Sequence, residues 1–147
     1  MNSFTIVRPE HLNHHNYLFG GAMLKWVDEY AWIAAALDFT GSTLVTKAMD
    51  DIVFRHRVIC GSILRFCILP VKKGLTSVTY SVEVFADEPG ATEEKHIFST
   101  TITFVNVDAA GNKTPLPDLD AYRSRTEHTP CRRPACRQRA CGGQSPC

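Results

Sequence analysis

Apolar residues recur at spacings of three and four over residues 21–39, which is the only long stretch of the chain with a helical period. Four alanines in its second half favour a helix. Trp32 lies on the opposite side, which indicates that the second face is covered too. We therefore predict a central helix that is apolar nearly all round and ends at Gly41. Its main apolar face comprises Met23, Trp26, Val27, Tyr30, Ile33, Ala34 and Leu37.

The rest of the chain reads as strands and turns. Strand-like sequence covers residues 3–9, 42–56, 61–71, 76–86 and 96–107, with turn-forming residues between them. The stretch 76–86 alternates cleanly and places four large side chains on one face, and a bulge is expected near Asp50–Asp51. One strand, one long helix and four further strands predict an α+β hotdog fold, an antiparallel sheet of about five strands wrapped around one long central helix.

Composition divides the 147 residues into two parts. Residues 1–120 carry a net charge of −4 and have enough apolar sequence for one globular domain, so they do not resemble a nucleic-acid binder. Residues 121–147 carry +5 and four of the six cysteines, with almost no large apolar residues. We predict that this Cys/Arg-rich tail is disordered. Its cysteines lack the short C-x2-C spacing of zinc modules.

The N-terminus does not resemble a signal peptide, and no apolar run reaches the roughly 20 residues that span a bilayer. The expected compartment is therefore the cytoplasm, with no membrane insertion. Cys60 and Cys67 lie in apolar, strand-like sequence and are expected to be buried.

Gly20 and Gly21 stand where the predicted helix begins. The first N–H groups of a helix have no intrahelical acceptor and lie at the positive end of its dipole. Glycine lets a carbonyl group come close, so a carbonyl oxygen bound there would be polarised as in an oxyanion hole. The alternative is that both glycines only allow tight packing of the helix on the sheet.

Asp28 lies seven residues after Gly21, about two helical turns further, at the edge of the apolar face. An acid at the border of a buried helix is costly unless it is paired or used. It is therefore a general base or nucleophile, or a helix-edge acid hydrogen-bonded to a neighbouring strand. Asn13, in the preceding loop, is an amide donor to a carbonyl or water, or an ordinary turn residue.

Three histidines, His11, His14 and His15, crowd the same loop. Their H-x-x-H-H spacing matches no common ligand scheme, and Asp28 is too far along the helix to be an obvious fourth ligand. We therefore predict no metal site and read the segment as a polar loop at a wet interface.

The segment "RPEHLNHHNYLFGGAMLKWVDEYAWIAA" resembles the N-terminal signature of hotdog acyl-CoA thioesterases, above all the small bacterial acyl-CoA hydrolases and the cytosolic and brain-type acyl-CoA hydrolases of animals. That signature has a proline, a loop with an asparagine, Gly-Gly, and an acid seven residues after the second glycine. The segments "VTKAMDDIVFRHRVICGSIL" and "ITFVNVDAAGNKTPLP" are similar to later parts of the same family. The resemblance covers about residues 5–118.

The resemblance implies that Asp28 is the catalytic acid, which activates water or attacks the thioester directly. It implies that Asn13 holds the carbonyl or the water and that the N–H of Gly21 polarises the thioester carbonyl. The family's site lies between two subunits, which supply the asparagine and the acid separately, so the resemblance implies a homodimer that often assembles into hexamers. It implies no cofactor other than the coenzyme A of the substrate.

Contacts to coenzyme A are expected from polar residues at two places, after one strand and around the "KKG" turn. The alternative is that these are ordinary solvated turn residues. The candidates at these two places are Arg55, His56, Arg57, Lys72, Lys73, Thr76 and Ser77, and Gly20 at the helix start is a further candidate.

Some positions depart from the family pattern. His11 stands where relatives commonly have an acid, Arg57 where a proline is usual, and Ser62 where an acid is usual.

Two alternative functions stay open: a non-catalytic acyl-CoA or lipid-binding hotdog protein, and a hotdog acyl-CoA hydratase or dehydratase. The second ranks low because no histidine lies early in the central helix.

Overall fold

The computed structural model describes residues 1–117, and the predicted tail, residues 121–147, lies outside this part. The helix starts at Gly20 and gives way at Phe39 to a turn in which Gly41 adopts a φ of +84°. The predicted helix end is therefore confirmed. The elements in chain order are β1 (Asn2–Ile6), a 3-10 turn (Pro9–His11), α1 (Gly20–Asp38), β2 (Leu44–Phe54), β3 (Ile63–Lys73), β4 (Ser77–Asp87) and β5 (Lys95–Asn106).

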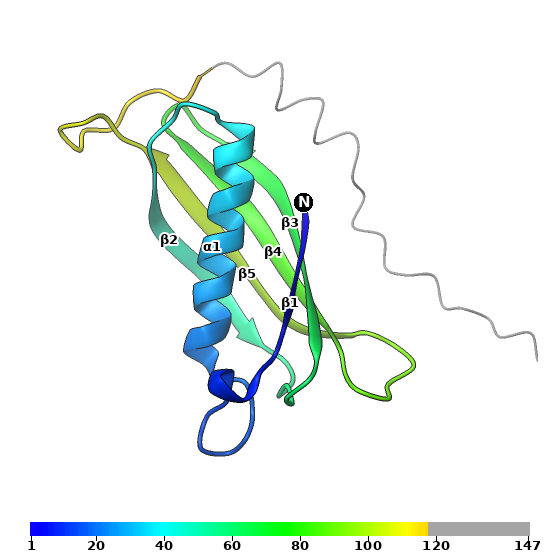
Figure 1. Cartoon of the computed structure of the whole chain (residues 1–147). Coiled ribbons are helices and arrows are strands. Elements are labelled where there is room, and N and C mark those ends of the chain that lie inside the picture. The colour runs from blue at the N-terminus through cyan, green and yellow to red at the C-terminus, as the bar shows by residue number, and fades with distance from the viewer. Residues whose placement is uncertain (118–147) are drawn as a thin grey trace, which may run out of the picture.

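The five strands form one antiparallel sheet in the order β1-β3-β4-β5-β2, so β1 and β2 are its edges. The helix α1 lies along one face of this sheet, obliquely to the strands (Figure 1). The register of β2 on β5 shifts between Asp50 and Val53, and Asp51 has a φ of +53°. The predicted bulge and the predicted α+β architecture are both confirmed.

The core lies between α1 and the sheet face that it covers. The alternating residues of β4 supply its centre, since Val78, Tyr80, Val82 and Val84 are at most 1% exposed. The Tyr80 hydroxyl donates to Asp38 Oδ2 at the end of α1, over 2.8 Å. This bond satisfies a buried phenol and ties the last turn of the helix to the middle of the sheet.

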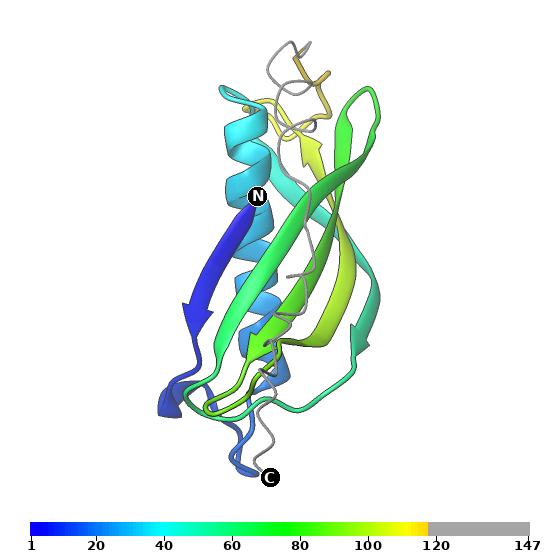
Figure 2. The ribbon, with the colours of Figure 1, turned by 90° about the vertical axis from the view of Figure 1, so that its right-hand side faces the viewer.

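The outward side of α1 is not covered within one chain, so the prediction of a helix buried nearly all round is wrong for the single chain. Trp32, Ile33 and Leu37 are 45%, 37% and 48% exposed. The reason is that one sheet covers only one side of a helix, as Figure 2 shows. The Trp32 indole Nε1–H donates to the carbonyl oxygen of Leu44 over 3.0 Å, which holds the ring over the start of the edge strand β2.

Two further expectations concern the two strand-like cysteines. Cys67 on β3 is buried, as expected, but Cys60 is exposed, because it lies in the turn before β3 rather than in a strand.

In residues 1–117, no helix has the length and apolar character needed to cross a bilayer.

The sequence "DAAGN", residues 108–112, turns the chain out of β5. Asp108 Oδ1 accepts the backbone N–H groups of Ala110 and Asn112, both over 2.9 Å, and Gly111 adopts a φ of +84°. These N–H groups, that of Asn112 first, lower the pKa of Asp108 from its ordinary value.

Candidate active site

The loop before α1 is closed by hydrogen bonds around Asn13. Its Oδ1 accepts the backbone N–H groups of His15 and Tyr17, over 2.9 and 3.2 Å. The Asn13 N–H donates to the Tyr17 carbonyl over 2.7 Å, and Asn16 has a φ of +62°. Because two N–H donors face the side-chain oxygen, the amide is oriented with its NH2 group left as a donor. Asn13 is therefore a turn residue and also an amide donor held in a fixed direction.

A cavity of about 310 Å³ opens beside this loop. It lies between the start of α1, the end of β2 and the segment that follows β2. Five of the predicted site residues line it together: Asn13, Gly20, Arg55, His56 and Arg57. Apolar side chains complete the wall: Tyr17, Leu18, Met23, Phe54, Val58 and Ile97. The cavity thus combines an apolar lining, one amide and a cationic rim, which is typical of a ligand site.

The first turn of α1 begins with two glycines, and a Cβ would be sterically tight only at the second, Gly21. A Cβ on Gly20 would lie 3.4 Å from the Phe54 ring, and one on Gly21 would lie 3.0 Å from the Phe19 ring. In the described part of the chain, neither glycine N–H has an acceptor. Both N–H groups are therefore available to an external oxygen. Gly21 is exposed but is not part of the cavity wall.

Asp28 lies two turns further along α1, half-buried beside β2. The Thr46 hydroxyl donates to Asp28 Oδ1 over 2.6 Å. The strand-bonded alternative for this acid is therefore observed, and the bond also fixes its rotamer. The wall of the cavity does not include Asp28. One chain therefore does not bring Asp28 and Asn13 into the same cavity.

Sequence reasoning missed Thr46. Nothing in the spacing of β2 marks this threonine, because its contact with Asp28 spans 18 residues and depends on how α1 lies on the sheet. The one signal that could have identified Thr46 is that a strand hydroxyl can bond an acid at the edge of a helix. The sequence does not show which strand lies beside the helix, so it does not single out this threonine.

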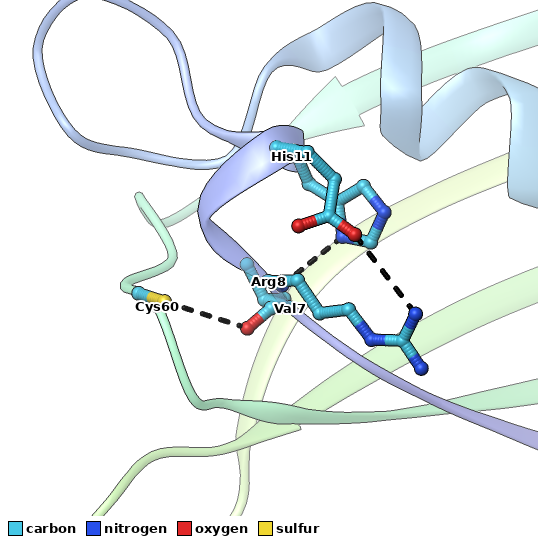
Figure 3. A network of polar contacts seen from close by, with 5 residues as sticks. Val7, Arg8, His11 and Cys60 are labelled. Carbon is cyan, nitrogen blue, oxygen red and sulfur yellow. Dashed lines mark hydrogen bonds and ion pairs between the residues drawn. The ribbon is translucent and has the colours of Figure 1, made fainter.

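The three histidines do not meet. His11 Nδ1 accepts the backbone N–H of Arg8 over 3.0 Å, as Figure 3 shows, and its ring packs edge-on against Trp26 at 4.7 Å. The rings of His14 and His15 lie 3.9 Å apart, tilted by 44° to each other, and both residues are exposed. In the part of the chain that the structure describes, no group of three His, Cys, Asp or Glu residues is placed to hold a metal. His11 thus braces the chain entering the loop.

The second group of predicted coenzyme A contacts lies at the other end of the sheet. Ser77 pairs with Val105 on β5, whereas Phe54 at the cavity pairs with Phe98. Seven residues of strand separate these positions, about 23 Å. Within one chain, Lys72, Lys73, Thr76 and Ser77 therefore do not reach the cavity, and their role as coenzyme A contacts stays a prediction.

Comparison with known proteins identifies the family of this chain. The model of the family described as "Thioesterase superfamily" matches residues 15–93. The chain is 34% identical over 116 residues to the uncharacterized acyl-CoA thioester hydrolase YkhA of Bacillus subtilis, covering 76% of this chain and 64% of YkhA. It is 27% identical over 122 residues to protein VdlD of Helicobacter pylori, covering 83% of this chain and 67% of VdlD. The chain thus spans about two thirds of these relatives.

A solved structure supports the same assignment. Cj0915 of Campylobacter jejuni, a hexameric hotdog-fold thioesterase, superposes with a TM-score of 0.70 at 31% identity. The match covers 78% of this chain and 88% of Cj0915. Since the family model covers more than half of the chain and the sheet-and-helix architecture agrees, this chain belongs to the Thioesterase superfamily and has the hotdog fold.

Proposed function

We propose that this protein is an acyl-CoA thioesterase, which hydrolyses an acyl-CoA thioester to a free acid and coenzyme A. One observation carries the proposal: the cavity beside the helix start combines an apolar lining, the oriented amide of Asn13 and three basic side chains. Membership of the Thioesterase superfamily and the similarity to YkhA, which is named as an acyl-CoA thioester hydrolase, support it.

In the proposed mechanism, Asp28 is the general base that takes a proton from water, or the nucleophile that attacks the thioester. The Asn13 amide and the Gly21 N–H donate to the carbonyl oxygen, which gains negative charge as the tetrahedral intermediate forms. The bond from Thr46 keeps the Asp28 carboxylate in one direction. A thiolate is a good leaving group, so a positioned water and a polarised carbonyl suffice.

We propose that the complete site combines Asn13 of one subunit with Asp28 of a second. Asp28 lies about 10 Å along α1 from Gly21, on the side of the free edge strand β2. Both elements present apolar side chains outward: Trp32, Ile33 and Leu37 on α1, and Val45, Ile52, Val53 and Phe54 on β2. A surface of this kind is typical of a subunit interface. The named hexameric state of Cj0915 supports self-association.

Leu37→Glu is expected to weaken self-association, because it places a charge in the outward apolar face of α1, in the last turn of the helix, where Leu37 is 48% exposed in the single chain. Size-exclusion chromatography with light scattering should show a lower mass and a steeper dependence on concentration. Leu75→Glu is the matched control, since Leu75 is 76% exposed in the β3–β4 turn, away from this face. An unchanged mass for Leu37→Glu would contradict this interface.

Arg55, His56 and Arg57 are proposed to contact the phosphates of coenzyme A at the cavity rim. All three side chains are exposed. Arg55 Nη1 also donates to Ser99 Oγ over 2.8 Å, which directs its guanidinium toward β5. We further propose residues 1–120 as the catalytic domain. Its last described segment is held to the β3–β4 turn where the Leu116 N–H donates to the Leu75 carbonyl over 2.8 Å.

The test of the function is thiol release from acyl-CoAs of graded chain length, followed with a thiol reagent. The expected result is free coenzyme A from at least one chain length. Tight acyl-CoA binding without thiol release would favour the non-catalytic binder instead. Addition of water to an enoyl-CoA with its thioester intact would favour the hydratase. The cytoplasmic location stays a prediction.

A further inference from the structure

The loop that carries Asn13 is joined to the far wall of the cavity at one point near its tip. The Arg57 guanidinium lies over the Tyr17 ring, 4.9 Å from the ring centre. The next residues make a backbone bond, from the Leu18 N–H to the Val58 carbonyl over 2.9 Å. The base of the loop closes separately, where the Phe19 N–H donates to the His11 carbonyl over 2.9 Å.

Tyr17 bonds directly to Asn13 through its backbone. Its N–H donates to Asn13 Oδ1, and its carbonyl accepts the Asn13 N–H. Whatever fixes Tyr17 therefore fixes the direction of the Asn13 amide. The Arg57 side chain is exposed and, in residues 1–117, has no carboxylate within ion-pair distance that would draw it off the ring. A cation placed over an aromatic face is attracted to the ring.

We propose that Tyr17, clamped under Arg57, is a positioning residue that aims the Asn13 amide at the substrate carbonyl. This inference rests on the proposed thioesterase function and assigns to that site a residue that does not itself touch the reacting atoms. The clamp links the segment after β2 to the loop before α1, so it closes one side of the cavity and directs the donor at the same time.

Tyr17→Leu tests the clamp, because leucine keeps an apolar wall but offers no ring face to Arg57. We expect kcat to fall about 10-fold or more, since a small misplacement of a catalytic group costs up to about 100-fold, while KM changes little. Tyr17→Phe keeps the ring face and should restore most of kcat. Arg57→Ala should lower kcat and raise KM, because it removes both the clamp and a cation at the rim.

A double variant separates positioning from a general structural role. If Tyr17 acts through Asn13, then Asn13→Ala with Tyr17→Leu should be no slower than Asn13→Ala alone. Multiplied losses in the double variant would overturn the proposal. So would a wild-type kcat in Tyr17→Leu.

Hydrogen exchange of the peptide that contains residues 13–18 gives a readout that needs no activity. Exchange should be faster in Tyr17→Leu and in Arg57→Ala, and as slow as in the wild type in Tyr17→Phe. Arg8→Ala is the matched control, since it removes an exposed arginine at the same end of the molecule whose guanidinium lies 3.9 Å from the Glu10 carboxylate.

Unchanged exchange in both Tyr17→Leu and Arg57→Ala would overturn the clamp. If the wild type releases no thiol from any acyl-CoA, the proposed function fails, and hydrogen exchange still decides whether the clamp exists. If circular dichroism shows that Tyr17→Leu does not fold, Arg57→Ala carries the test, because its side chain is exposed.

Discussion

Replacing Asp28 by asparagine is expected to lower kcat for acyl-CoA hydrolysis by about 10²- to 10⁴-fold, the usual contribution of a positioned general base. The asparagine has the same shape and keeps an oxygen that can accept the Thr46 hydroxyl, which bonds Asp28 Oδ1 over 2.6 Å. The substitution thus removes the basic or nucleophilic carboxylate and little else. Steady-state thiol release should show the loss in kcat rather than in KM.

Glu29→Gln is the matched control for this variant. Glu29 is the next residue on α1 and is exposed, so the change removes one carboxylate from the same helix without touching Thr46. We expect its kcat to equal that of the wild type. Light scattering should show an unchanged oligomer for both variants. Full activity in Asp28→Asn would exclude Asp28 as base or nucleophile.

Asn13→Asp is expected to lower kcat by about 10²- to 10³-fold, as the removal of one oxyanion-hole donor does. Aspartate retains a carboxylate oxygen for the N–H groups of His15 and Tyr17, so the loop keeps its bonds. It has no NH2 group to offer the carbonyl, and it adds a negative charge where negative charge develops. Thiol release gives the kcat, and hydrogen exchange of the loop should stay at the wild-type rate.

Asn16→Asp is the control for the charge change. Asn16 is exposed in the same loop, is not part of the cavity wall, and has a φ of +62°, which aspartate also tolerates. Equal losses in Asn13→Asp and Asn16→Asp would mean that the loop's charge, and not the Asn13 donor, sets the rate.

The local pattern of apolar and polar residues was sufficient to predict the helix and the strands. A period of 3.6 predicted the helix that became α1, and alternation on β4 predicted the four side chains that lie at the centre of the core. The bulge at Asp51 and the "DAAGN" turn were also predictable, since both depend on residues adjacent in the chain. That Asn13 and Gly20 lie beside one another on the cavity wall was also predictable, because a loop and the helix that follows it stay together.

The sequence by itself thus determined the elements, the α+β class and the residues at the helix start. Only the tertiary structure decided which side chains distant in sequence contact each other: the Thr46 hydroxyl bonds Asp28, and the Arg57 guanidinium lies over the Tyr17 ring. It also decided that Trp32 and Leu37 face outward, although their pattern reads as buried. The physical reason is that periodicity records which side chains avoid water, whereas one chain has only one sheet to cover its helix.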